Sequence, residues 1–88
     1  MCTCITSTVA VAGAGKGAEG WFRVTESTVG YDHPSFSGAE HAILLDFTNQ
    51  DIGLSARVAL ELDLESGRAL LAQLEETIRA AEASGVAA

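Results

Sequence analysis

The chain has 88 residues, 48% of them hydrophobic, with twelve acidic and five basic residues and a formal net charge of −7. This length accommodates one compact domain, residues 1–88, whose small core favours pairing of two copies as a homodimer. The negative charge argues against nucleic acid and anionic membranes as partners, because both require a basic surface. No apolar run approaches the roughly 20 residues of a membrane span.

The start of the chain has no basic segment followed by an apolar one, which is the pattern of a signal peptide. We therefore expect a cytoplasmic protein, in which thiols stay reduced and a structural disulfide does not form. Cys2 and Cys4 are the only cysteines. On one extended strand their side chains point the same way and lie about 7 Å apart, which is too far for a disulfide.

Four strands are predicted before a single helix. Thr3 to Ala12 alternates Thr, Val and Ile and predicts the first strand, and Trp21 to Tyr31 predicts the second. His41 to Thr48 and Ala56 to Leu62 predict the third and fourth strands, each with a mainly apolar face. From Leu64 to Ala83 the apolar positions recur every three or four residues, which predicts a helix.

The predicted helix has favourable residues at both ends. Asp63 suits the N-cap, and Glu65 lies in the first turn, where the helix dipole favours a negative charge. Glu75 and Arg79 have the spacing of an i,i+4 ion pair. Gly85 suits the C′ position after the last turn.

The order ββββα predicts an α+β fold, with a four-stranded antiparallel sheet and one C-terminal helix packed on one face. The face expected to meet the helix carries Ile5, Val9, Val11, Ile43, Leu45, Phe47, Val58, Leu60 and Leu62. The opposite face carries Cys4, Thr6, Thr8, Leu44, Asp46, Arg57, Ala59 and Glu61. Because this second face is mixed rather than purely polar, we expect a dimer contact or a small-molecule ligand there.

Residues 13–20, GAGKGAEG, predict a flexible hairpin loop with an exposed Lys16. The segment is not a P-loop, because that spacing needs Gly at position 10, where the chain has Ala10, and a helix instead of a strand afterwards. A mobile Lys16 could still close over an anionic ligand. Trp21, beside the loop, is expected in the core or an interface more than as a stacking platform.

His33 and His41 are the only histidines, and the loop between them could bring them together. Two imidazoles with one or two thiolates are suitable ligands for Zn²⁺ or Fe²⁺. Their spacing matches no established zinc pattern, and isolated His and Cys are more often loop or core residues.

Cys2 has a further property, because removal of the initiator methionine before a small residue would make it the N-terminus. A free amine beside a thiolate can bind a metal or activate the thiol. On the mixed face, Glu26, Asp46 and Glu61 could perform acid–base chemistry, but ion pairs with Arg57 are the more usual outcome.

Several short segments, in order, resemble a family of short actinobacterial proteins of unknown function, DUF6295. They are MCT at the start, GKG-x-x-GW at 15–21, YDHP at 31–34, EH at 40–41, DF at 46–47 and SARVA at 55–59. The resemblance covers nearly the whole chain. It implies a stand-alone bacterial protein and no particular activity.

The residues that match the family's pattern are Cys2, Lys16, Trp21, Asp32, His33, Pro34, His41, Asp46 and Arg57. The family typically has an aromatic residue in place of Cys4 and often another histidine where this chain has residues 35–37. The resemblance therefore favours Cys2, His33 and His41 as an open three-ligand metal site over a site that includes Cys4.

Two functions remain as hypotheses, beside a third option of a purely structural dimer with no pocket. The first is a small transition-metal-binding protein or metalloenzyme that uses Cys2, His33 and His41. The second is a metal-free accessory protein of a biosynthetic pathway, which binds a small molecule as a homodimer. Its ligand-binding residues would be Lys16, Trp21, Asp32, Asp46 and Arg57, with His33 near Lys16.

Overall fold

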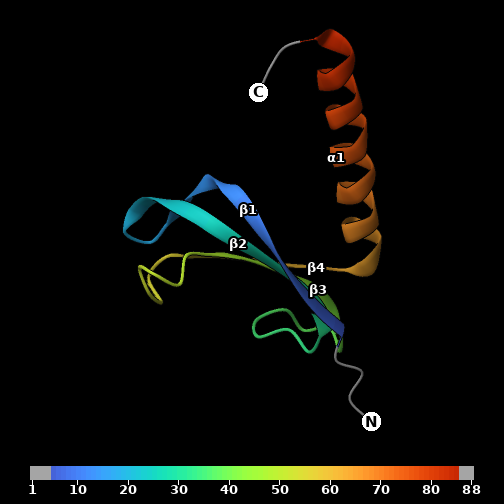
Figure 1. Ribbon diagram of the computed structural model, residues 1–88. Helices are drawn as coiled ribbons and strands as arrows, with labels where there is room; N and C mark the ends of the chain where they lie inside the picture. Colours follow the sequence, from blue (N-terminus) through green and yellow to red (C-terminus); the bar gives the residue numbers. More distant parts are fainter. Residues whose placement is uncertain (1–4, 86–88) are drawn as a thin grey trace.

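The computed structural model describes residues 5–85 as one sheet followed by one helix (Figure 1). The elements are β1 (Ile5–Gly17), β2 (Gly20–Asp32), β3 (Ala42–Thr48), β4 (Arg57–Leu62) and α1 (Leu64–Ser84). Each strand pairs antiparallel with the next one along the chain, in the order β1-β2-β3-β4. The predicted ββββα architecture is therefore confirmed, and short connections explain why neighbours in sequence are neighbours in the sheet.

The prediction of a flexible loop over residues 13–20 is wrong. Gly13 to Gly17 continue β1 and pair with residues 20–24 of β2, so that only Ala18 and Glu19 form the turn. At Gly15 a Cβ atom would come within 3.1 Å of the Val24 side chain and 3.2 Å of the Val58 side chain. The glycine thus allows a close approach of two strands and does not mark a flexible segment.

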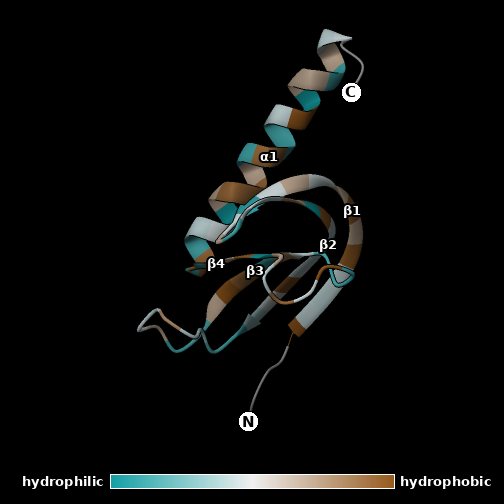
Figure 2. Cartoon of the chain, turned by 90° about the vertical axis from the view of Figure 1, so that its left-hand side faces the viewer, coloured by the Kyte–Doolittle hydropathy of each residue, from teal (hydrophilic) through white to brown (hydrophobic). Residues whose placement is uncertain are grey.

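The pairing of β1 with β2 is interrupted once, between Ala10 and Gly13, where β1 has an extra residue. Such a bulge bends its strand and breaks the alternation of faces. Beyond the bulge the hairpin curls toward β4, because Gly17 lies against the backbone carbonyls of Ser55 and Arg57. The sheet is therefore strongly coiled and partly folded over itself (Figure 2).

The helix begins and ends where its local sequence predicts. The Asp63 carboxylate accepts a hydrogen bond from the backbone N–H of Ser66 at 2.6 Å. The side-chain hydroxyl of Ser66, and secondly this backbone N–H, hold the pKa of Asp63 below its ordinary value. At the other end Gly85 adopts a left-handed conformation with φ of 73°. Glu75 and Arg79 form the expected ion pair at 3.7 Å.

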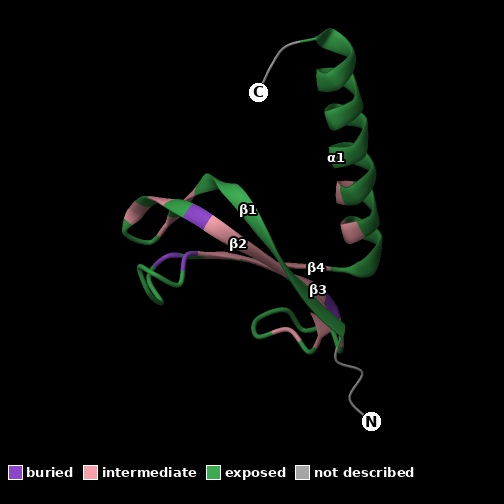
Figure 3. Ribbon diagram, in the orientation of Figure 1, coloured by how far each residue is buried: buried purple, intermediate pink, exposed green. Residues whose placement is uncertain are grey.

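The helix contacts the sheet through its first turns alone. The backbone of Gly67 approaches so closely that an added Cβ would lie 3.0 Å from the Ile43 side chain. Beyond Leu70 the helix projects past the sheet and all of its residues are exposed (Figure 3). Within residues 5–85, no helix is long and apolar enough to cross a membrane.

The protein has a very small core for its size. Among the described residues, the buried apolar side chains are those of Val24, Ala42 and Ala56. The side chain of Asn49 is also buried. Its Nδ2 donates a hydrogen bond to the Arg23 carbonyl at 3.0 Å, and its Oδ1 accepts one from the backbone N–H of Asp51 at 3.0 Å. Val24, Ala56 and Asn49 lie near the coiled half of the hairpin and the β3–β4 turn, whereas Ala42 lies at the other end of the sheet, where β3 begins.

Candidate functional site

Three aromatic rings form a stack where β2 ends and β3 begins. The ring centroids of His33 and His41 lie 4.7 Å apart at an interplanar angle of 31°. The His41 ring also stacks on Tyr31, with centroids 5.3 Å apart and an angle of 23°. The loop between the two histidines thus brings them together, as their flanking positions in the sequence predicted.

The orientation of His33 is fixed by a hydrogen bond. Its Nδ1 atom lies 2.7 Å from the Glu40 carbonyl oxygen, and a carbonyl oxygen can only accept. In the neutral ring the proton therefore sits on Nδ1, and the lone pair is on Nε2. This arrangement is the one that metal-bound histidines commonly have, with the second ring nitrogen donating to a carbonyl.

The loop that carries the histidines is anchored by Glu61 of β4. Its carboxylate accepts hydrogen bonds from three successive backbone N–H groups: Ser35 at 2.7 Å, Phe36 at 3.2 Å and Ser37 at 2.8 Å. The Ser37 bond makes the largest contribution to a lowered pKa for Glu61, with smaller ones from Ser35 and Phe36, while desolvation opposes them. The three N–H groups thus favour the ionised form of Glu61, and the ionised carboxylate holds the loop.

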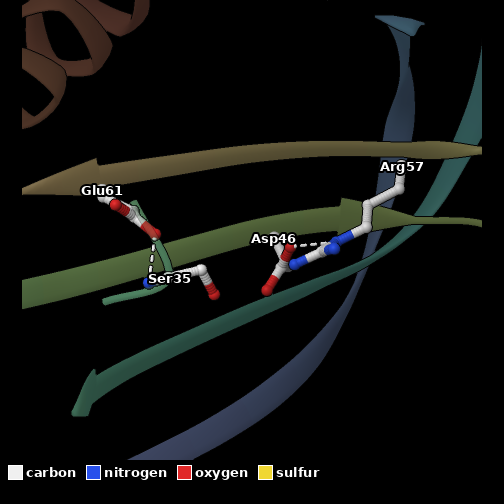
Figure 4. Close-up of polar contacts among 4 residues, drawn as sticks. All are labelled: Ser35, Asp46, Arg57 and Glu61. Atoms are coloured by element: carbon white, nitrogen blue, oxygen red, sulfur yellow. Dashed lines mark hydrogen bonds and ion pairs between the residues drawn. The ribbon is translucent and has the colours of Figure 1, made fainter. Parts of the chain in front are cut away.

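A second polar contact lies on the same face of the sheet. Nε of Arg57 donates to Oδ1 of Asp46 at 2.6 Å across β3 and β4 (Figure 4). This hydrogen bond, and secondly the charge of Asp46, raise the pKa of Arg57. The expected pairing of Arg57 with a carboxylate is therefore present for Asp46, whereas Glu61 binds backbone N–H groups instead.

The candidate ligand-binding residues are divided among three places. Lys16 and Trp21 pair across β1 and β2 beside the hairpin turn, and Trp21 is exposed. Asp46 and Arg57 lie in the middle of the sheet, and Asp32 is the last residue of β2, at the other end. The expectation that His33 lies near Lys16 is wrong. Lys16 pairs with the start of β2 (Gly20–Asp32) and His33 follows its end, so the length of this strand separates the two residues.

The cysteines Cys2 and Cys4 lie outside the described residues. Within residues 5–85, no group of three or more His, Cys, Asp or Glu side chains is arranged to hold a metal ion. The histidine pair therefore supplies at most two ligands from this part of the chain.

An apolar groove lies between α1 and the sheet, beside the contact of Gly67 with Ile43. It has a volume of about 390 Å³. Its lining consists of Val29, Ile43, Leu45, Leu64, Gly67, Arg68, Leu70, Leu71 and Leu74. The prediction that Ile43 and Leu45 lie on the sheet face that meets the helix is confirmed. The groove between this face and the helix was not predicted.

Two residues, Glu61 and Asn49, have structural roles that the sequence did not indicate. Glu61 reads locally as one more charged residue on a mixed strand face, and nothing near it points to a loop 24 to 26 residues earlier. Asn49 follows β3 in an N-Q-D-I-G segment, whose composition indicates a turn. Its burial depends on β2 lying against that turn.

Comparison with known proteins identifies the family alone. No curated protein and no solved structure matches the chain. One family model matches residues 1–87, and its description is a family of unknown function. The chain therefore belongs to the DUF6295 family, as the segments shared with it indicated.

Proposed function

We propose that the protein binds a transition metal, Zn²⁺ or Fe²⁺, through His33, His41 and Cys2. The observation that carries this proposal is the 4.7 Å separation of the two imidazole rings. The hydrogen bond from Nδ1 of His33 to the Glu40 carbonyl supports it, because it leaves Nε2 free to bind a metal.

The chain length between Ile5 and Cys2 is compatible with Cys2 as the third ligand. Ile5 pairs with Tyr31, two residues before His33. Cys2 is three residues from Ile5, and three residues span at most about 11 Å. Three residues of chain are therefore long enough for a Cys2 thiolate to reach this end of the sheet, and the proposal requires a reducing compartment in which the thiol stays free.

Three protein ligands would leave one coordination position open. Catalytic zinc and iron sites have this arrangement, and a metal in such a site activates bound water or dioxygen. A metalloenzyme is therefore the more specific form of this proposal, and a metal-binding protein without catalysis is the more general one.

The test is elemental analysis of protein purified without an affinity tag. We expect Zn or Fe near one atom per chain, and its loss in His33→Ala. Ser35→Ala, in the same loop, is the matched control, because only its backbone N–H contacts Glu61. Sub-stoichiometric Zn, Fe, Cu, Ni and Mn in every preparation would contradict metal binding.

A second candidate function is binding of an apolar small molecule in the groove between α1 and the sheet. Its volume of about 390 Å³ falls within the range of ligand pockets, and its lining is apolar apart from Arg68. Native mass spectrometry of freshly purified protein would detect a retained ligand. We expect Leu45→Gln to remove it, and retention of the ligand in that variant would exclude the groove.

A further inference from the structure

The first observation is an excess of exposed surface. The chain exposes 6840 Å². A compact monomer of its 9.1 kDa mass exposes about 4,900 Å². Even if the seven residues outside 5–85 added as much area as an extended chain, roughly 1,000 Å², roughly 900 Å² would remain unexplained. This remainder is comparable with the ≈ 800 Å² that each partner buries in a stable interface.

Part of the exposed apolar surface lies on the helix and on the sheet beside it. Leu71, Leu74 and Ile78 are 65%, 52% and 54% exposed, although they form the apolar stripe of α1. Val29 and Leu60, on the sheet face that meets the helix, are exposed as well. A small molecule in the groove would leave Ile78 uncovered, because Ile78 is not part of the groove lining. A larger partner is needed to cover both surfaces.

The apolar stripe of α1 has the pattern of a helix that pairs with another helix. Leu64, Leu71 and Ile78 recur every seven residues, and each is followed three residues later by Gly67, Leu74 or Ala81. This is the a and d spacing of a coiled-coil seam. The 21-residue helix is about 31 Å long, so that the seam extends well past the sheet.

The charges beside this seam are complementary between two antiparallel copies. Arg68, Glu75 and Glu82 also recur every seven residues, on one flank of the seam. When two such helices run antiparallel about an axis at Glu75, Arg68 of each copy faces Glu82 of the other. The two Glu75 side chains then lie near each other, and the ion pair of each with Arg79 moderates their repulsion.

We propose that a second copy of this chain covers the groove and the helix seam, with the two α1 helices antiparallel across a twofold axis. Because two chains of charge −7 repel each other, we expect them to associate through an apolar surface with few acidic residues. The two copies would bury Leu71, Leu74 and Ile78 of each chain. This inference does not depend on metal binding.

The first test is the mass of the protein in solution by light scattering. We expect twice the chain mass of 9.1 kDa for the wild type and a single chain mass for Leu74→Glu. Leu54→Glu is the matched control, because Leu54 is 97% exposed on the β3–β4 turn, outside the seam. A monomeric wild type, a dimeric Leu74→Glu or a monomeric Leu54→Glu would each overturn the proposed interface.

The second test uses charge and does not rely on Leu74→Glu folding. Arg68 and Glu82 are both exposed, so that neither variant should disturb the protomer. Arg68→Glu and Glu82→Lys should each raise the dissociation constant severalfold, and mixing the two variants should restore association. If the mixture associates no better than either variant alone, the antiparallel arrangement is wrong.

Discussion

The carboxylate of Glu61 accepts a 2.7 Å hydrogen bond from the backbone N–H of Ser35, and so ties the loop between β2 and β3 to the last strand (Figure 4). Two further N–H groups, of Phe36 and Ser37, donate to the same carboxylate. His33 and His41 lie at the two ends of this loop, so Glu61 helps to set the distance between their rings.

Replacement of Glu61 by Gln should loosen the loop between β2 and β3. The neutral amide oxygen is a weaker acceptor than a carboxylate and cannot bind three N–H groups equally well. Amide hydrogen exchange at Ser35, Phe36 and Ser37 should accelerate, as measured by NMR. Glu76→Gln on the exposed side of α1 makes the same change in charge and should leave these amides unaffected; equal protection in both variants would show that Glu61 does not anchor the loop.

Acid should release the same loop. Because the pKa of Glu61 is lower in the folded protein than in the unfolded chain, its contribution to stability is complete above the ordinary glutamate pKa. That contribution is lost as the pH falls through the lowered value, because the protonated carboxyl no longer accepts from three N–H groups. Exchange at Ser37, corrected for its intrinsic pH dependence, should therefore increase below about pH 4, and less so in Glu61→Gln.

Gly30→Ala should destabilise the pairing of β1 with β2. A Cβ at Gly30 would lie 2.9 Å from the backbone carbonyl oxygen of Ile5, which cannot move without shifting its strand. We expect a loss of about 1–3 kcal/mol in the free energy of unfolding, measured with urea. Gly13→Ala is the control, because its Cβ would meet nothing within 4 Å. Equal stability of the two variants would contradict the close approach at Gly30.

The ion pair of Arg57 with Asp46 should contribute little to stability. The two side chains are 57% and 28% exposed, so solvent screens their attraction. Arg57→Gln should lower the free energy of unfolding by at most about 1 kcal/mol, and the effect should shrink in high salt. Urea titrations at low and high ionic strength measure this, and a larger loss that salt leaves unchanged would indicate a structural role beyond the ion pair.

Metal binding should distinguish the two cysteines. Cys2→Ser removes a thiolate from the proposed site with His33 and His41, and should abolish stoichiometric metal. Cys4→Tyr should retain it, because Cys4 is not one of the three proposed ligands. Elemental analysis of both variants is the measurement, and retained metal in Cys2→Ser would restrict the site to the histidine pair.

The sequence alone determined the order of four strands and one helix and the caps of that helix, because those features depend on short-range chemistry. Alternation predicted four strands, and the caps at Asp63 and Gly85 follow from hydrogen bonds within a few residues. The loop between His33 and His41 is likewise short enough for their proximity to be expected. The family also followed from short segments of the sequence.

The tertiary structure decided what depends on strands distant in the sequence. Residues 13–17 look like a loop until Val58 is brought against Gly15, where an added Cβ would lie only 3.2 Å from the Val58 side chain. Glu61 looks like a solvated charge until the β2–β3 loop presents three N–H groups to it. The apolar stripe of α1 was predictable, but its exposure was not, because only the direction in which the helix leaves β4 determines how much of the stripe the sheet covers.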